Sequence, residues 1–464
     1  MNKQTVRLLI CSNSGPGPLD DPPVRPGSAA AGGLVPHVLE LLSACGGDWL
    51  YRGEGPQVAW TPRGDTTVRL RPVSARSHDR GHYEVISIQT LLWLFHYLHD
   101  TTNSPAFDRD VQRAWENYRE INREFARQAA ASRANDQDTV VLVNDYHLML
   151  VPGLLREAGI SPQTRVVYSH HVPWCEPAYF GILPAALRTE VLTSLLCADV
   201  LSFHCRRWLD AFVGCCAHYL PARVTGDTVE YAGRRVRLVS VPFPLDTPTV
   251  ERLADAPAWH HQQDELDRLL RGRQLLARVD RLDLWKNQPR GFKAYAELLD
   301  RRPDLAADWC FVAVQASPRY RSPRHEAYAA VCHDIVSEIN GRYGNGTVEL
   351  SVSAGPNTRA RALATLNRAD AVLINPTYDG FNIVAKEAMF AAERSIILLS
   401  VNAGAHEYLA PAVTSIEPFD ISGTAAALES ILVPDSCAAP SGLRQQIRSD
   451  SPDYWLRTIL DGGN

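Results

Sequence analysis

The sequence lacks the features that would tie the chain to a membrane or to nucleic acid. No apolar run approaches the ~18 residues that a membrane-spanning helix needs. Lys3 and Arg7 surround only a short apolar run, residues 8–11, which is too brief for the hydrophobic region of a signal peptide. The 47 basic and 52 acidic residues give a net charge of −5, without the basic excess typical of nucleic-acid binding. We therefore expect a cytoplasmic protein whose partners are small molecules. The sequence is also compatible with a homo-oligomer.

Metal-binding and redox cysteines are also missing. The ten cysteines form no Cys-x-x-Cys pair and no Cys/His spacing typical of zinc. Cys215 and Cys216 are adjacent, but successive side chains on a helix diverge, so we expect them to serve packing. Buried thiols are the expected state of the cysteines.

What the sequence does contain is a repeated alternation of apolar strands and helices over 464 residues, more than a single core usually holds. Strands are expected at residues 6–11, 139–143, 165–169, 199–203, 274–279, 310–314, 348–352, 371–374 and 395–400. The alternation predicts an α/β fold with parallel sheets and helices on both faces. Because the proline-rich stretch 241–248 interrupts it, we expect domains at 1–240 and 241–441, and a final helix within 442–464 that docks back on the first domain.

Residues 379–387, Asp-Gly-Phe-Asn-Ile-Val-Ala-Lys-Glu, are the most informative stretch because they follow an apolar strand and open a helix. Free N–H groups at such a helix start favour an anion such as a diphosphate. Glu387 is placed to accept hydrogen bonds from a ribose diol, and Asp379 from a sugar. Between them stand Gly380, Phe381, Asn382, Ile383 and Val384. Taken by itself, the segment is more typical of an acidic cap on an ordinary crossover helix.

A second strand end carries two cations, Arg281 and Lys286, five residues apart. Strand ends line the ligand crevice of open α/β sheets, so both cations could meet the phosphates bound by residues 379–387. A solvated turn is the alternative for the pair alone. A glycine-rich segment, residues 14–33, could close over a ligand or be a flexible surface loop.

Six ordered motifs make the chain resemble the trehalose-6-phosphate synthases, and the resemblance covers almost its whole length. They are Gly32-Gly33-Leu34, Asn144-Asp145-Tyr146-His147-Leu148, His171-Val172-Pro173-Trp174, Arg281 to Lys286, residues 339–344 and residues 379–387. The resemblance implies a retaining glycosyltransferase of GT-B architecture, with two Rossmann-like domains facing across a cleft. The first domain would bind the acceptor and the second the nucleotide sugar.

The resemblance also implies residue roles. Arg281 and Lys286 would bind the donor diphosphate, and Glu387 the ribose. His171 and Asp379 would contact the transferred sugar. The remaining implied residues are Gly32 and Gly33 in the glycine loop, the backbone of residues 380–384 at the phosphates, and Asp145, which would orient sugar or acceptor. His171 at a strand end is otherwise typical of a hydrogen-bonded structural histidine.

The resemblance further implies a reaction that needs no metal and no cofactor beyond the donor, a UDP- or GDP-linked sugar. The departing phosphate oxygen can take the acceptor proton, so no separate protein base is required. The one Asp-x-Asp spacing that suggests a metal, Asp108-Arg109-Asp110, lies in a polar segment without a preceding strand. We expect it to be a solvated helix start.

The acceptor half departs from the family pattern. Ser14 stands where the synthases usually place an arginine that grips the phosphate of glucose 6-phosphate, and Arg52 and Leu92 stand where they have tryptophans. Tyr83 and Arg321 still fall at acceptor positions. Losing the arginine removes a contact worth about 1.5–3 kcal/mol, so we expect an altered acceptor, with a role in natural-product assembly.

Three alternatives remain. Genuine trehalose-6-phosphate synthesis is one. Asn287, where the synthases usually have glycine, is similar to the pseudo-glycosyltransferase branch that couples a nucleotide-activated cyclitol to an aminocyclitol. The third is a non-catalytic regulator that binds a sugar nucleotide.

Overall fold

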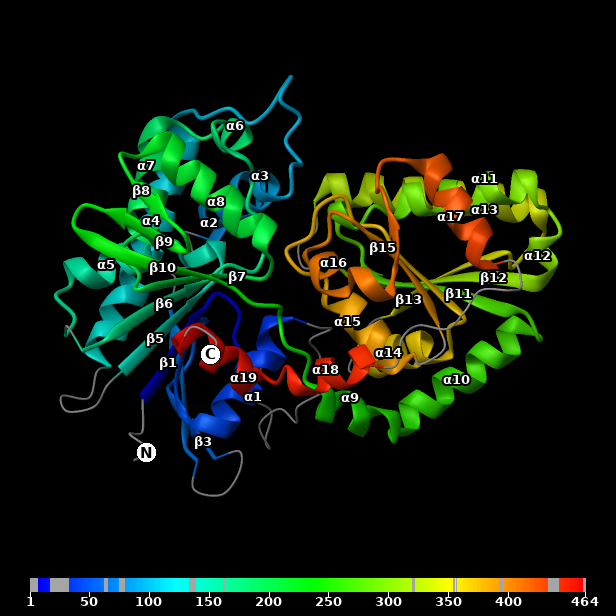
Figure 1. Ribbon diagram of the computed structural model, residues 1–464, viewed down its shortest axis with the longest axis horizontal. Coiled ribbons are helices and arrows are strands. Elements are labelled where there is room, and N and C mark those ends of the chain that lie inside the picture. Colours follow the sequence, from blue (N-terminus) through cyan, green and yellow to red (C-terminus); the bar gives the residue numbers. More distant parts are fainter. Residues whose placement is uncertain are drawn as a thin grey trace. The chain divides into compact units, whose positions relative to one another are not determined.

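The computed structural model divides the chain into two compact units. Unit 1 comprises Met1–Val24, His37–Pro242 and Pro452–Asn464, and unit 2 comprises Arg25–Pro36 and Phe243–Ser451. The structure describes residues 7–16, 33–61, 66–74, 80–132, 139–161, 163–318, 322–353, 355, 357–392, 395–432 and 442–461. Each unit is built around one sheet with helices packed on it (Figure 1).

Unit 1 contains a ten-stranded sheet with the order β3-β4-β2-β1-β5-β6-β7-β10-β9-β8. Its strands are β1 (Arg7–Ser12), β2 (Gly47–Arg52), β3 (Val58–Trp60), β4 (Val68–Val73), β5 (Thr139–Asn144), β6 (Arg165–Ser169), β7 (Val200–Phe203), β8 (Arg223–Thr225), β9 (Thr228–Tyr231) and β10 (Arg234–Ser240). The central strands pair in parallel, and antiparallel pairs occur only toward the two edges. The strand sequence turns back between β1 and β5, which creates a switch point where their carboxyl ends diverge.

The helices of unit 1 connect these strands. They are α1 (Leu34–Cys45), α2 (Arg80–Glu84), the π-helical η2 (Val85–Leu92), α3 (Trp93–Phe95), α4 (Arg109–Ala131), η3 (Tyr146–Leu148), α5 (Val151–Glu157), α6 (Pro177–Phe180), α7 (Ala185–Leu195), α8 (Arg206–Tyr219) and the C-terminal α19 (Pro452–Asp461). Helix α19 packs on this unit through Trp455, whose ring lies edge-on to His37 at 4.6 Å.

Unit 2 contains a fully parallel six-stranded sheet with the order β13-β12-β11-β14-β15-β16. Its strands are β11 (Gln274–Arg281), β12 (Trp309–Ala316), β13 (Val348–Ser353), β14 (Ala371–Ile374), β15 (Ile396–Ser400) and β16 (Thr414–Ile416). Its helices are α9 (Thr247–Ala254), α10 (Pro257–Leu270), η4 (Leu284–Lys286), α11 (Gln288–Arg301), α12 (Leu305–Asp308), α13 (Pro323–Tyr343), α14 (Thr358–Arg368), α15 (Ile383–Ala391), α16 (Gly404–Leu409), η5 (Ala410–Ala412), α17 (Ile421–Leu432) and α18 (Gly442–Ser449). This is the Rossmann order, with its switch point between β11 and β14.

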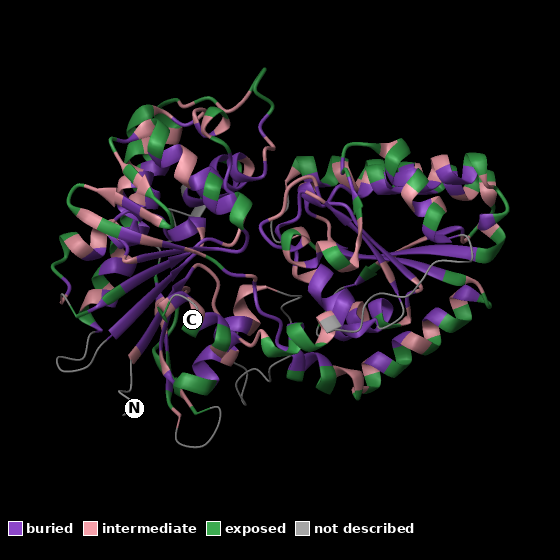
Figure 2. Cartoon of the chain, viewed as in Figure 1, coloured by how far each residue is buried: buried purple, intermediate pink, exposed green. Residues whose placement is uncertain are grey.

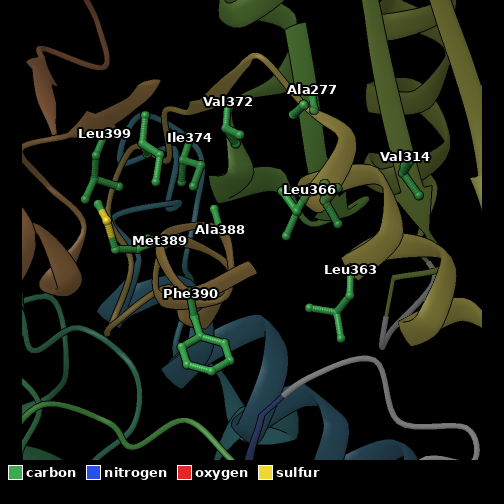
Figure 3. Packing of buried hydrophobic residues seen from close by; sticks show 14 of the residues in the cluster. Ala277, Val314, Leu363, Leu366, Val372, Ile374, Ala388, Met389, Phe390 and Leu399 are labelled. Atoms are coloured by element: carbon green, nitrogen blue, oxygen red, sulfur yellow. The ribbon is translucent and has the colours of Figure 1, made fainter. Parts of the chain in front are cut away.

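The unit 2 sheet separates two apolar cores, because side chains of a strand alternate between its faces. Leu275 and Ala277 of β11 join the core with α10, α14 and α15, whereas Leu276 joins the core with α11, α13 and α17. Figure 3 shows the first core, in which Met389 and Phe390 of α15 take part. The strands are accordingly buried on both faces (Figure 2). These cores fix the strand ends and the start of α15.

The expected strands are confirmed with shifts of one or two residues at their ends. The expected single final helix is wrong, because α18 ends at Ser449 and α19 begins at Pro452. A proline has no N–H to continue a helix but fits its first position. Helix α18 contributes Ile447 to the core of unit 2, whereas α19 belongs to unit 1.

The expected buried thiols are largely confirmed. Nine cysteines lie in the described residues, all free, and seven are buried. Cys197 is half-buried and Cys45 is exposed, which corrects the expectation for those two. Cys437 lies outside the described residues.

The acidic residues on either side of Arg109 lie at the exposed start of α4, as expected. Asp108 Oδ1 accepts hydrogen bonds from the backbone N–H groups of Asp110 and Val111, both at 3.0 Å, at the start of α4. Among the residues that the structure describes, no group of three or more His, Cys, Asp or Glu side chains could hold a metal ion. The helices described here include none long and apolar enough to cross a membrane.

Buried histidines should make unit 1 sensitive to acid. Burial lowers the pKa of His37 and of His170 from 6.5 to about 3. The unfolded chain therefore binds protons below pH 6.5 that the folded unit does not, so stability falls as pH drops from 6.5 toward 3. Between pH 7.5 and 5.5 each histidine should cost about 1.4 kcal/mol, measurable by urea unfolding followed by circular dichroism.

A matched pair of variants tests this prediction. His170→Gln should reduce the loss between the two pH values by about 1.4 kcal/mol, since one titrating group is removed. His261→Gln should leave it unchanged, because that side chain is 69% exposed. An unaltered pH dependence in His170→Gln would contradict the assignment.

Candidate functional site

The predicted donor residues gather at the switch point of unit 2. The loop after β11 and the loop after β14 are joined there by a hydrogen bond of 2.8 Å from the Thr377 N–H to the Trp285 carbonyl. Carboxyl ends of neighbouring strands that diverge in this way leave the crevice in which open α/β sheets bind ligands. The structure thus brings together two segments that lie about a hundred residues apart in sequence.

Lys286 connects the two loops electrostatically. Its ammonium donates to Asp379 Oδ2 at 2.7 Å and lies 3.6 Å from Asp280 Oδ1. Burial opposes the charge, but Asp379 and Asp280 outweigh it, and the pKa of Lys286 is raised above its ordinary value. The ammonium therefore stays positive at neutral pH.

Arg278 and Asp280 complete this network, and neither was predicted. Arg278 Nη2 lies 2.9 Å from Asp280 Oδ2, and the guanidinium also donates to Asn375 and to the carbonyl of Lys286. Burial raises the pKa of Asp280, while Arg278 and Lys286 lower it less strongly. Two charged residues inside an apolar strand were the signal that could have identified them.

Arg281, the second predicted cation, is positioned by Asp283. Its Nη2 lies 2.7 Å from Asp283 Oδ2, and this carboxylate is the main cause of the raised pKa of Arg281. Asp379 and Asp280 contribute to the same shift. Arg281 thus belongs to the charge cluster that contains Lys286.

The predicted anion cradle is the start of α15. Asn382 caps the helix with φ +72° and donates through Nδ2 to Asp379 Oδ2 at 3.1 Å. The helix begins at Ile383, so the N–H groups of Ile383 and Val384 lie in its first turn. The turn before it is fixed because the Phe381 carbonyl accepts from Ala405 N–H at 2.7 Å. The structure differs from the expectation in starting the helix after Phe381 and Asn382.

Glu387 lies on α15 in contact with an arginine that sequence reasoning missed. Its Oε1 is 3.3 Å from Arg359 Nη2, and both side chains are buried. Burial raises the pKa of Glu387, and Arg359 and Lys286 partly offset that effect. Arg359 stands 28 residues away on α14 and has no sequence motif, so only the fold reveals it.

In unit 1, Asp145 and His171 come together at the carboxyl ends of β5 and β6. Asp145 has φ +71° and ψ 166°, a strained conformation for a residue with a side chain, which is often found at functional sites. Its Oδ1 accepts from the His171 N–H at 3.2 Å. The conformation directs attention to Asp145 independently of any motif.

The imidazole of His171 lies in a chain of polar contacts. Its Nε2 is 2.9 Å from Asn144 Oδ1 and its Nδ1 is 2.8 Å from His204 Nε2, while His204 Nδ1 is 3.3 Å from the Val241 carbonyl. Each neutral imidazole carries one N–H proton, so two neutral rings can donate in only two of these three contacts. The third contact is a hydrogen bond only when the pair of rings holds a third proton. Burial first, then His204, lowers the pKa of His171 well below its ordinary value.

Two of the predicted acceptor residues meet near β1. The Arg52 guanidinium carbon lies 4.3 Å from the centre of the Tyr83 ring, a cation–π arrangement. The Tyr83 hydroxyl donates to Asn13 Oδ1 at 3.0 Å, next to Ser14. Within the described part of the chain, Arg52 has no hydrogen-bond or ion-pair partner. These residues lie at the β1/β5 switch point of unit 1.

The other predicted positions are less informative. Leu92 is a buried residue of η2, 5% exposed, in the hydrophobic core. Gly33 has φ +100°, which a residue with a side chain rarely adopts. Gly32 and Arg321 lie outside the described residues.

Asn287 has a structural role in unit 2. Its φ of +59° is left-handed, a conformation that glycine and asparagine tolerate best. Its Nδ2 donates to the carbonyls of Asn375 and Pro418 at 2.8 and 2.7 Å. The exchange of glycine for asparagine is explained by the backbone and by these contacts.

Comparison with known proteins places this geometry in a family. The model of glycosyltransferase family 20 matches residues 53–461. Trehalose-6-phosphate synthase of Mycobacterium sp. (strain KMS) is 31% identical over 457 residues, covering 93% of this chain and 89% of that protein. Validamine 7-phosphate valienyltransferase of Streptomyces hygroscopicus subsp. jinggangensis is 30% identical over 381 residues, covering 80% and 74%.

A solved structure shows the same fold. The α,α-trehalose-phosphate synthase (UDP-forming) from Burkholderia xenovorans, in complex with glucose-6-phosphate, superposes with a TM-score of 0.82 over 98% of this chain and 99% of that one, at 24% identity. The expected GT-B fold with two Rossmann-like domains is thereby confirmed. Because the family model spans most of the sequence, the chain belongs to glycosyltransferase family 20, as its motifs predicted, and is a glycosyltransferase.

Proposed function

We propose that the protein is a retaining glycosyltransferase that moves a sugar from a nucleotide-diphosphate donor to a sugar-like acceptor, forming a trehalose-like linkage. The observation that carries the proposal is the contact of Lys286 with Asp379 at the start of α15. A cation, a sugar-binding carboxylate and a helix N-terminus within one cluster match the charge distribution of a diphosphate sugar. Relatives named as trehalose-6-phosphate synthases support a UDP-linked donor.

The reaction places charge where this cluster can stabilise it. The bond from the anomeric carbon to the diphosphate oxygen breaks, and the acceptor oxygen bonds to the same carbon on the same face. The acceptor proton passes to the departing phosphate oxygen. Lys286, Arg281 and the first turn of α15 stabilise the negative charge that develops on the diphosphate.

An altered acceptor is the second part of the proposal. Ser14 cannot supply the charged contact that its family counterpart makes to a phosphate. Arg52 instead lies over Tyr83 at the same switch point. An acceptor other than glucose 6-phosphate, in natural-product assembly, explains both replacements, and the likeness to a valienyltransferase supports such a setting.

Cyclitol coupling is a second candidate because the valienyltransferase is as similar as the synthases are. The residue that favoured it in sequence, Asn287, is explained by its left-handed backbone and its contacts to two carbonyls. Sugar transfer therefore remains the first choice.

A screen of donors and acceptors tests the proposed function. Purified protein is incubated with UDP- and GDP-sugars and with glucose 6-phosphate, unphosphorylated amino sugars or aminocyclitols, and products are identified by mass. We expect transfer to an acceptor other than glucose 6-phosphate. Rapid trehalose 6-phosphate formation would contradict the altered acceptor, and tight donor binding without any turnover would indicate a regulator.

Lys286→Gln should lower the turnover number for transfer by about 100-fold, since loss of one group that stabilises the leaving charge costs about 3 kcal/mol. Glutamine keeps a donor toward Asp379, which limits the structural damage. Lys293→Gln, an exposed lysine on α11, is the matched control and should retain activity. Full activity of Lys286→Gln in steady-state assays would exclude the role.

Restoring the family pattern should shift acceptor preference. The double variant Ser14→Arg with Arg52→Trp should raise kcat/KM for glucose 6-phosphate by about 10- to 100-fold, the value of one charged phosphate contact. Arg235→Trp, with a side chain 76% exposed, is the control and should change nothing. Unchanged kcat/KM in the double variant would show that other residues select the acceptor.

A further inference from the structure

Lys386, which the proposed reaction does not use, holds a fully buried positive charge. Its side chain has 0% exposure. The ammonium donates to the Phe243 carbonyl at 2.9 Å and to Asp450 Oδ2 at 3.1 Å. Burial lowers its pKa, and Asp450 partly offsets that effect. A buried charge is costly unless it is paired, so these two contacts are strongly favoured.

Aromatic rings enclose the same ammonium. The Tyr408 ring lies 4.6 Å away and the Phe381 ring 5.5 Å away, at distances where a ring face attracts a cation. The Tyr408 hydroxyl also donates to Asp450 Oδ2 at 2.6 Å. Phe381 belongs to the turn that precedes the anion-binding start of α15. The buried cation is thus in contact with Phe381 of this turn as well as with Asp450 and Phe243.

The partners of Lys386 stand at two places where the chain passes between the units. Phe243 is the first residue of unit 2 after Pro242, and Asp450 precedes the return to unit 1 at Pro452 by two residues. Lys386 itself is next to Glu387 on α15. One ammonium therefore ties both crossings to the helix that carries the predicted ribose and phosphate contacts.

The unit 1 side of the crossing between Pro242 and Phe243 is also close to predicted site residues. The Val241 carbonyl lies 3.3 Å from His204 Nδ1, and His204 is in contact with His171. Site-proximal side chains thus lie on both sides of Pro242, each within its own unit. Val241 thus contacts His204 within unit 1, and Phe243, two residues later, contacts Lys386 within unit 2.

We propose that Lys386 is a positioning residue that couples occupation of the donor site to the two crossings at Phe243 and Asp450. The proposal rests on the proposed function, in which residues of unit 2 bind the nucleotide-sugar donor. Nucleotide bound at the start of α15 restrains Phe381 and Glu387, and Lys386 passes that restraint to both crossings. A purely structural ion pair with Asp450 would stabilise unit 2 without this coupling.

Hydrogen exchange with and without UDP or GDP tests the coupling directly. In the parent, nucleotide should slow exchange at residues 381–387 and also at 243–246 and 447–451. In the double variant Lys386→Met with Asp450→Asn, the first protection should remain and protection at the crossings should be lost. The double variant removes both charges together, so neither is left buried and unpaired.

Each outcome decides a separate question. Absence of protection at residues 381–387 in the parent would contradict the proposed donor site. Protection there without a response at the crossings would overturn the coupling while leaving the donor site intact. Crossings that still respond in the double variant would reduce Lys386 to a structural role.

Activity supplies the second measurement. The double variant should keep a melting temperature near that of the parent, yet its kcat for transfer should fall at least tenfold, with donor KM changed less than threefold. Tyr408→Phe keeps the ammonium and its two polar contacts, and should transfer at near the parent rate. A double variant that is as stable as the parent and also transfers at the parent rate would contradict the proposal.

Discussion

The pairing of buried charges at the carboxyl edge of the unit 2 sheet is the constraint on which the site depends. Three ion pairs, with distances between 2.7 and 3.6 Å, join the four residues Arg278, Asp280, Lys286 and Asp379. Removing Asp280 would leave Arg278 without its carboxylate partner in this set, and an unpaired buried ion costs about 3–5 kcal/mol. The loops after β11 and β14 are therefore held together by charge neutrality. The cation predicted to meet the diphosphate is oriented before any ligand arrives.

Helix α15 extends the same constraint through the unit. It is buried along most of its length, so its two charged residues need internal partners. Glu387 has Arg359, and Lys386 has Asp450. Because the two residues are adjacent, a helix turn directs them to different surroundings. One faces the predicted ribose site, and the other faces the residues where the chain leaves the unit.

The departures from the family pattern have different physical origins. Asn287 replaces glycine at a left-handed position and binds two carbonyls, so it reports on the backbone. Arg52 stacks on Tyr83 beside the loop after β1, where we propose that its charge changes which acceptor is recognised. The first kind of departure is uninformative about substrate. The second kind is the basis for the proposed change of acceptor.

Much of the fold followed from the sequence alone, because strand and helix periodicities and the motif at residues 379–387 are local. The sequence also located Arg281, Lys286 and Glu387 at strand and helix ends. Only the tertiary structure decided their partners, since Asp379 lies 93 residues from Lys286, Arg359 lies 28 from Glu387, and Phe243 lies 143 from Lys386. It also divided the final helix in two. Side-chain pairing depends on which surfaces the folded core brings together, and no local pattern records that.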